Sequence, residues 1–128
     1  MPRKAISTNN APLAIGSYSQ AVITRDMVYL SGQIPLNPDT MEIVSKDFSE
    51  QLHQVFSNLA AVAQASGGSL DDIVKLTVYL TDLQNFPLVN EIMPKYFNEP
   101  YPARAAIGVC ALPKDALVEI DGILYLEA

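Results

Sequence analysis

The sequence predicts an α+β fold in which two helices pack on one face of a mixed β-sheet. Its apolar and turn-forming residues place the elements in the order strands, helix, strand, helix, strands. Each helix carries one apolar stripe, so the two together cover one face of the sheet and leave the other open. No linker interrupts the pattern between residues 1 and 128, and we therefore expect a single domain.

The first half of the chain is expected to supply three strands and the longer helix. Asp47 followed by Glu50 resembles a capping box, which is typical of the start of a helix. Apolar residues then recur at helical spacing until Gly67 and Gly68 end the pattern. The strand signals before this helix lie at residues 5–7, 20–24 and 27–32.

The second half alternates between strand and helix. Residues 73–81 alternate between apolar and polar side chains, which is typical of a strand with one core face. Pro87 suits the opening of the second helix, whereas Pro94 lies inside its apolar stripe and should kink or shorten it near Asn90. The two last strands are expected at residues 103–112 and 117–126.

The open face of this sheet needs a cover, because the last strands carry apolar side chains on both sides. Hydrophobic residues make up 49% of the chain and charged residues only 17%, which is apolar for a soluble domain. We therefore expect a second copy of the chain to cover the open face, in a homo-oligomer.

Charge and composition argue against several partners. The formal net charge is −6 and the eight Lys and Arg residues form no stripe, so a nucleic-acid surface is not expected. The apolar runs are too short to cross a membrane, and the first residues lack the apolar core of a signal peptide, which predicts a cytoplasmic protein.

Metal and cofactor chemistry are not expected either. The chain has one cysteine, Cys110, and one histidine, His53, so it cannot form an internal disulfide or a Cys/His zinc site. Cys110 is expected to fill core space. The chain contains no glycine-rich phosphate loop and no nucleotide fingerprint, so the expected activity is cofactor-free chemistry or plain binding.

Arg104 is the most informative residue, because it is a cation inside the apolar run 101–113. A buried guanidinium keeps its charge and is tolerated only when an anion meets its donors, which predicts a site for a carboxylate. Alternatively, Arg104 pairs with Glu119 or Asp121 of its own chain. If the faces of the last two strands coincide, Arg104 and both carboxylates line the surface between copies.

Five segments resemble the RidA/YjgF family of enamine/imine deaminases, in the right order and nearly end to end. The segments are residues 14–20, 30–35, 82–86 together with 89–91, 101–104, and 112–121. The resemblance implies a chorismate-mutase-like fold and a homotrimer in which three sheets close into a barrel, with the helices outside. It also implies a ligand cleft at each boundary between subunits.

The resemblance also implies an activity and site residues. The family hydrolyses short enamines and imines of the 2-aminoacrylate and 2-iminobutanoate type to 2-keto acids and ammonia, without a cofactor. By similarity, Arg104 clamps the substrate carboxylate with help from the backbone amides of Gly32 and Ala106. The remaining positions that match the family's site are Tyr18, Ser31 and Asn90.

Asp121 is interpreted as standing where the family usually has glutamate, as the acceptor that presents a water to the imine carbon. Its side chain is one methylene shorter than glutamate. This difference predicts a slower enzyme, a roomier pocket, or participation by Glu119 or an extra water.

Two other function classes stay open for the same scaffold. One is a small-carboxylate binding or regulatory protein that does not catalyse the hydrolysis. The other is a ribonuclease or translation-inhibiting activity sometimes attached to the family, which the acidic balance of the chain disfavours.

Overall fold

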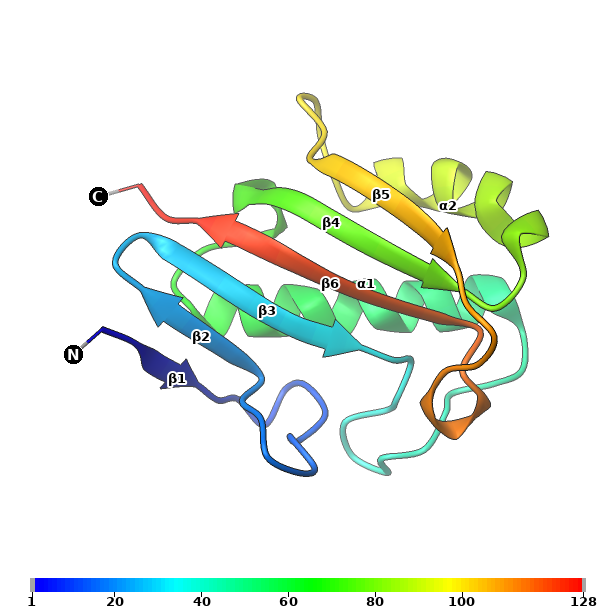
Figure 1. Ribbon diagram of the computed structural model, residues 1–128, viewed down its shortest axis with the longest axis horizontal. Helices are drawn as coiled ribbons and strands as arrows, with labels where there is room; N and C mark the ends of the chain where they lie inside the picture. The colour runs from blue at the N-terminus through cyan, green and yellow to red at the C-terminus, as the bar shows by residue number, and fades with distance from the viewer. Residues whose placement is uncertain (1, 128) are drawn as a thin grey trace.

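The computed structural model describes residues 2–127 and contains one six-stranded mixed sheet with both α-helices on the same face (Figure 1). This confirms the predicted fold class. The strands are β1 (Lys4–Ile6), β2 (Ala21–Thr24), β3 (Met27–Gln33), β4 (Ile73–Leu80), β5 (Ala103–Gly108) and β6 (Val118–Tyr125). The α-helices are α1 (Phe48–Ala65) and α2 (Phe86–Ile92), and 3-10 turns occupy Leu70–Asp72, Leu83–Asn85, Met93–Lys95 and Pro113–Asp115.

The strand order in the sheet is β1-β2-β3-β6-β4-β5. Neighbouring strands are antiparallel except β4 and β5, which are parallel. The last two strands of the chain are therefore not neighbours, because β4 lies between them. This arrangement leaves β5 at one edge of the sheet, with α2 beside it (Figure 1).

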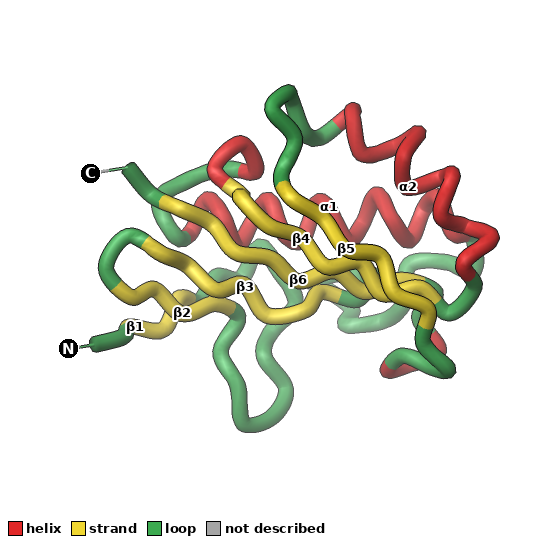
Figure 2. Tube along the Cα trace, turned by 45° about the horizontal axis from the view of Figure 1, so that its top comes forward, coloured by secondary structure: helices red, strands yellow, loops and turns green. Residues whose placement is uncertain are grey.

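The core lies between the sheet and the helices, which form a separate layer behind the strands (Figure 2). Of the four alternating residues of β4 that were predicted to face the core, Leu76, Val78 and Leu80 are fully buried. The prediction is wrong for Val74, which is 46% exposed, because the strand register shifts between Ile73 and Lys75 and Ile73 is buried in its place. The residues of β6 that face the core are buried as well. Burying one such aliphatic side chain stabilises the fold by roughly 1.5–3 kcal/mol. The fully buried residues of the two strands are Leu76, Val78, Leu80, Val118, Ile120 and Leu124.

Helix α1 begins and ends close to the predicted residues. The carboxylate of Asp47 accepts a hydrogen bond from the Glu50 amide at 3.0 Å. Such a cap stabilises a helix by about 1 kcal/mol. The helix ends at Ala65, and Gly67 follows it in the left-handed region with φ 97°.

Pro94 shortens the second helix, as predicted. Helix α2 ends at Ile92, and the chain continues through the 3-10 turn Met93–Lys95, which contains Pro94. Proline has no amide proton to donate to the carbonyl of Asn90, so the α-helical pattern cannot continue through it. Asn90 stays on α2 with its side chain exposed.

Strand β5 is shorter than predicted. It ends at Gly108, although the amide of Val109 still donates to the carbonyl of Leu80 at 2.9 Å. Its neighbour β4 ends at Leu80, so the next residues of the edge strand have no partner. Cys110 is consequently exposed, and the expectation that it fills core space is wrong.

The open face of the sheet carries large apolar side chains. Tyr29, Ile107 and Tyr125 are exposed by 49%, 45% and 44%. Tyr29 is opposite Ile123 in the register of β3 and β6, so these side chains lie on the face away from the helices.

None of the helices within residues 2–127 is both long enough and apolar enough to cross a bilayer.

Candidate functional site

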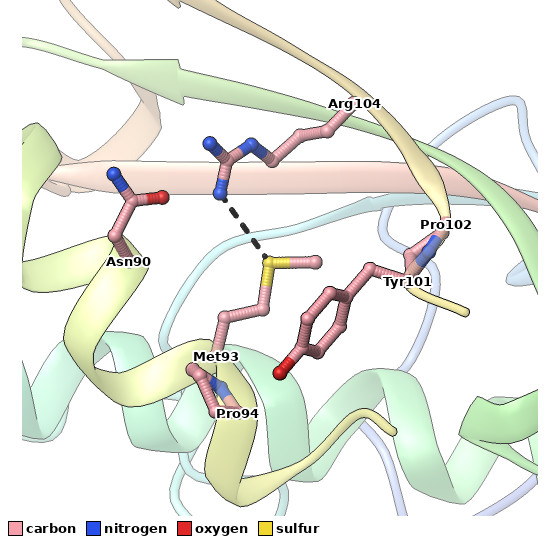
Figure 3. A pocket seen from close by; sticks show the side chains of 6 residues that line it. All are labelled: Asn90, Met93, Pro94, Tyr101, Pro102 and Arg104. Atoms are coloured by element: carbon pink, nitrogen blue, oxygen red, sulfur yellow. Dashed lines mark hydrogen bonds between the residues drawn. The ribbon is translucent and has the colours of Figure 1, made fainter. Parts of the chain in front are cut away.

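Two cavities contain four of the seven expected site residues, Arg104 and Asn90 in one and Tyr18 and Gly32 in the other. The first, which we call the arginine cavity, has a volume of about 320 Å³ and is lined by Asn90, Met93, Pro94, Tyr101, Pro102 and Arg104 (Figure 3). The second, the glutamate cavity, has a volume of about 410 Å³. It is lined by Pro12, Leu13, Ile15, Tyr18, Gln20, Gly32, Gln33, Ile34, Leu36, Pro113, Lys114 and Glu119.

Arg104 lies on the helix side of the edge strand. It is opposite Leu76 in the parallel register of β4 and β5, and Leu76 is fully buried in the core. Its guanidinium carbon lies 4.9 Å from the centroid of the Phe86 ring, and one of its nitrogens lies 3.6 Å from the sulfur of Met93. An aromatic face and a thioether therefore hold the guanidinium, which is half-buried.

The hypothesis that Arg104 shares a face with Glu119 and Asp121 is wrong. On β4, Leu76 is opposite both Arg104 and Gly122, whereas Thr77 is opposite Asp121 and Tyr79 is opposite Glu119. Successive residues of a strand point to opposite faces, so both carboxylates lie on the open face and Arg104 lies on the helix face. The alternative of an ion pair within the chain is wrong for the same reason.

The donors of Arg104 are consequently available to a ligand. Within residues 2–127, the hydrogen-bond partner of the guanidinium is the Met93 sulfur, which is a weak acceptor. A guanidinium presents five N–H donors in a planar fork that matches a carboxylate. The arginine cavity can therefore bind a small carboxylate through two parallel hydrogen bonds.

Asn90 is the expected site residue that the structure brings together with Arg104. Its side chain amide and the guanidinium face each other across the cavity, from α2 and β5 (Figure 3). Tyr101 closes another side and was not expected from the sequence, although it directly precedes the Pro-Ala-Arg segment. The Met93 and Phe86 side chains, which hold the guanidinium, come from the same helical segment as Asn90.

The glutamate cavity contains Tyr18, Gly32 and Glu119. Glu119 is half-buried, and its pKa is raised above the ordinary range, first by burial and then by the negative charge of Asp121. A side chain on Gly32 would collide with the Glu119 carboxylate, so this residue must be glycine for the carboxylate to lie against the backbone. Most of the other lining residues are apolar.

Tyr18 lies on the loop before β2, with an exposed ring. Its hydroxyl oxygen accepts a hydrogen bond from the amide of Ile15 at 3.2 Å. The proton of this hydroxyl can still be donated to a ligand or a water. Tyr18 therefore stands at the rim of the glutamate cavity and not beside Arg104.

Ser31, Ala106 and Asp121 line neither cavity. The hydroxyl of Ser31 donates to the carbonyl of Ser19 at 2.5 Å, which fixes the loop that carries Tyr18 to β3. Ala106 is opposite Val78 and packs against the core on the same face as Arg104. Asp121 accepts a hydrogen bond from the Tyr79 hydroxyl at 3.0 Å.

Lys114 lines the glutamate cavity and was not among the site residues expected from the sequence. It and Asp115 both have positive φ angles, 56° and 58°, in the 3-10 turn before β6. Non-glycine residues rarely adopt this conformation, and such strain is often found at functional sites. Lys114 supplies positive charge at the rim of the cavity that contains Glu119.

The described residues contain no group of three or more His, Cys, Asp or Glu side chains that could hold a metal ion. The charged groups that line the two cavities are the guanidinium of Arg104 in the first, and the ammonium of Lys114 and the carboxylate of Glu119 in the second.

Comparisons with known proteins place the whole chain in a family. The model of the family described as Endoribonuclease L-PSP matches residues 8–126. A 2-iminobutanoate/2-iminopropanoate deaminase from Dermatophagoides farinae is 44% identical over 98% of this chain and 98% of the relative. The crystal structure of RidA from an Antarctic Psychrobacter superposes with a TM-score of 0.93 at 50% identity, covering 96% of this chain and 99% of that one.

A further solved structure, E. coli TdcF with bound serine, has a TM-score of 0.91 at 40% identity and covers 97% of this chain and 99% of that one. These matches extend over nearly the whole chain, in sequence and in structure. The chain therefore belongs to the RidA/YjgF family, as its sequence motifs indicated.

Proposed function

We propose that this protein is a cofactor-independent deaminase that hydrolyses short 2-imino acids, of the 2-iminobutanoate and 2-iminopropanoate type, to 2-keto acids and ammonia. The observation that carries the proposal is the guanidinium of Arg104, which is half-buried in a cavity and, within residues 2–127, is held by the thioether of Met93 and the ring of Phe86. The name of the D. farinae relative and the serine bound to E. coli TdcF support a small amino-acid-like ligand.

In this proposal the Arg104 fork binds the substrate carboxylate, and the exposed amide of Asn90 contacts the ligand from the other side of the cavity. The backbone amides of Gly32 and Ala106 are proposed to donate further hydrogen bonds to the substrate carboxylate. Binding by two parallel charge-assisted hydrogen bonds fixes the orientation of the imine carbon relative to an incoming water.

The proposed active assembly is a homotrimer with a site at each boundary between subunits. One chain presents its cation on the helix face and Glu119 on the open face, so a small substrate cannot reach both within one copy. A neighbouring copy can bring its glutamate cavity to the arginine cavity. The exposed apolar side chains of the open face support burial against other copies.

We assign the water-activating role to Glu119 instead of Asp121. Glu119 lines the same cavity as Tyr18 and Gly32, whereas Asp121 lines neither cavity and is bonded to Tyr79. In the reaction, water attacks the iminium carbon and gives a proton to the Glu119 carboxylate. That proton passes to the amino group of the resulting carbinolamine. The carbinolamine hydroxyl then gives its own proton to the Glu119 carboxylate as the C–N bond breaks, so that ammonia leaves and the 2-keto acid forms.

A coupled assay tests the proposal by generating 2-aminoacrylate and 2-iminobutanoate in turn and following their decay. Wild type should accelerate both hydrolyses over buffer. Glu119→Gln should lose most of this activity, roughly a hundredfold, because general base catalysis contributes on that scale. Asp121→Asn should keep most of it at neutral pH. The reverse ranking would restore Asp121 as the catalytic carboxylate.

The two alternatives give different results. Calorimetry that detects 2-keto acid binding, with no acceleration over buffer, would make the protein a carboxylate-binding protein. RNA cleavage that disappears in Arg104→Ala would instead support the activity that the family description names.

A further inference from the structure

Three side chains on the open face form a connected group next to the glutamate cavity. Glu119 and Asp121 are two residues apart on β6, so their Cα atoms lie roughly 7 Å apart on the same face. Tyr79 is opposite Glu119 on β4, and its hydroxyl reaches diagonally to Asp121 with an O···O distance of 3.0 Å. The hydroxyl therefore bonds the neighbour of Glu119 and not Glu119 itself.

The hydrogen bond from Tyr79 holds the Asp121 carboxylate in a fixed direction beside Glu119. The pKa of Tyr79 is raised, chiefly by this hydrogen bond to Asp121. Two neighbouring carboxylates resist being ionised together, and Asp121 contributes, after burial, to the raised pKa of Glu119. The position of the Asp121 carboxylate therefore bears on the protonation of Glu119.

The groups that face Glu119 come from several elements. Asp121 lies on its own strand, Tyr79 on β4, Tyr18 on the loop before β2 and Lys114 on the turn before β6. Lys114 is exposed, and its ammonium group lies 3.5 Å from the carbonyl of Met41. Asp121 is therefore the negative charge of this group that is fixed in position by a hydrogen bond.

We propose that Asp121, held by Tyr79, is a positioning residue that adjusts the protonation of Glu119 for imine hydrolysis. This inference rests on the proposed function, in which Glu119 exchanges a proton with water and then with the departing amine. A carboxylate whose basicity is increased by a neighbouring charge accepts the proton of water more readily and still returns it. The raised pKa of Glu119, caused first by burial and then by Asp121, agrees with this role.

The test is an NMR titration of the Glu119 side-chain carboxyl in wild type and in Asp121→Asn. Asparagine has the same shape and can still accept the Tyr79 hydrogen bond, so the fold should be kept. The Glu119 pKa should decrease but stay above its ordinary value, because burial remains its main cause. Asp26→Asn, at the turn between β2 and β3 at the far end of the sheet, is the matched control and should leave the titration unchanged.

A double-mutant cycle tests the part played by Tyr79. Because the hydroxyl is bonded to Asp121, Tyr79→Phe should alter the Glu119 titration in the wild-type background and have no effect in the Asp121→Asn background. An equal effect in both backgrounds would show that Tyr79 acts on Glu119 directly, and this would overturn the proposal.

Activity provides the second measurement. The acidic limb of the kcat/KM profile should move to lower pH in Asp121→Asn, because the variant keeps Glu119 ionised in more acidic solution. If another copy brings its Arg104 close to Glu119, the added positive charge acts in wild type and in Asp121→Asn alike. The acidic limb should therefore still move to lower pH in the variant. An unchanged Glu119 titration in Asp121→Asn would refute the inference whatever the activity. A shifted titration with full activity in Glu119→Gln would instead refute the proposed function.

Discussion

The arginine cavity and the glutamate cavity differ in how the chain builds them. Side chains build the first, because Phe86 and Met93 of the second helical segment hold the Arg104 guanidinium. Backbone shape builds much of the second, where Gly32 leaves room for a carboxylate and Lys114 adopts a left-handed conformation. One cavity therefore contains a cation without an anion, and the other contains a carboxylate on the opposite face of the sheet. Under the proposed function, the two cavities are half-sites that two copies of the chain bring together.

Replacing the cation should have the largest effect. Arg104→Ala should lower kcat/KM for 2-iminobutanoate roughly a hundredfold or more, because it removes both charge-assisted hydrogen bonds to the carboxylate. Arg104→Lys should recover only part of the loss, since an ammonium cannot form the paired bonds. Arg3→Ala, an exposed arginine before β1, is the control and should keep wild-type activity. Full activity in Arg104→Ala would remove the arginine cavity from the site.

Adding a methyl group to the glutamate cavity should have the next largest effect. In Gly32→Ala the new Cβ would overlap the Glu119 carboxylate, which is the flexible end of a side chain and can move away. We therefore expect roughly a tenfold loss of kcat with a small change in thermal stability. In the control Gly108→Ala, the new Cβ would meet only Leu83 side-chain atoms, the nearest at 3.1 Å, and activity should stay near wild type. Equal activities in the two variants would contradict the role of Gly32.

The aromatic support of Arg104 should have the smallest effect. Phe86→Leu removes the ring 4.9 Å from the guanidinium, and a cation–π contact contributes about 0.5–1 kcal/mol. KM should therefore rise roughly threefold to fivefold while kcat changes little. Phe97→Leu, a core substitution in the same part of the chain, should lower stability without raising KM. A similar KM in both variants would show that Phe86 contributes only packing.

The fold could be predicted from the sequence wherever the pattern was local. The alternation of β4 from Leu76 onward, the Asp47 cap and the shortening at Pro94 each depend on neighbouring residues, and each prediction is confirmed. The length of β5 was overestimated because an edge strand continues only as far as its partner, and the sequence does not reveal which strand that partner is.

The site was harder to predict because its geometry depends on strand order. Arg104 and Asp121 lie on strands that are consecutive in the chain, and they were expected on one face of the sheet. The insertion of β4 between their strands and the register that it imposes place them on opposite faces. The family motifs named most of the polar residues, but only the structure distinguishes Glu119 inside a cavity from Asp121 outside it.

The proposal that two copies complete one site can be tested by mixing two damaged variants. Arg104→Ala and Glu119→Gln should each retain little activity alone. After dissociation and reassociation at equal amounts, about a quarter of the adjacent pairs in a cyclic assembly would join an intact Arg104 to an intact Glu119. The mixture should therefore recover about a quarter of wild-type activity. Mixed assemblies that form, as verified by native mass spectrometry, but show no activity above the separate variants would contradict the shared site.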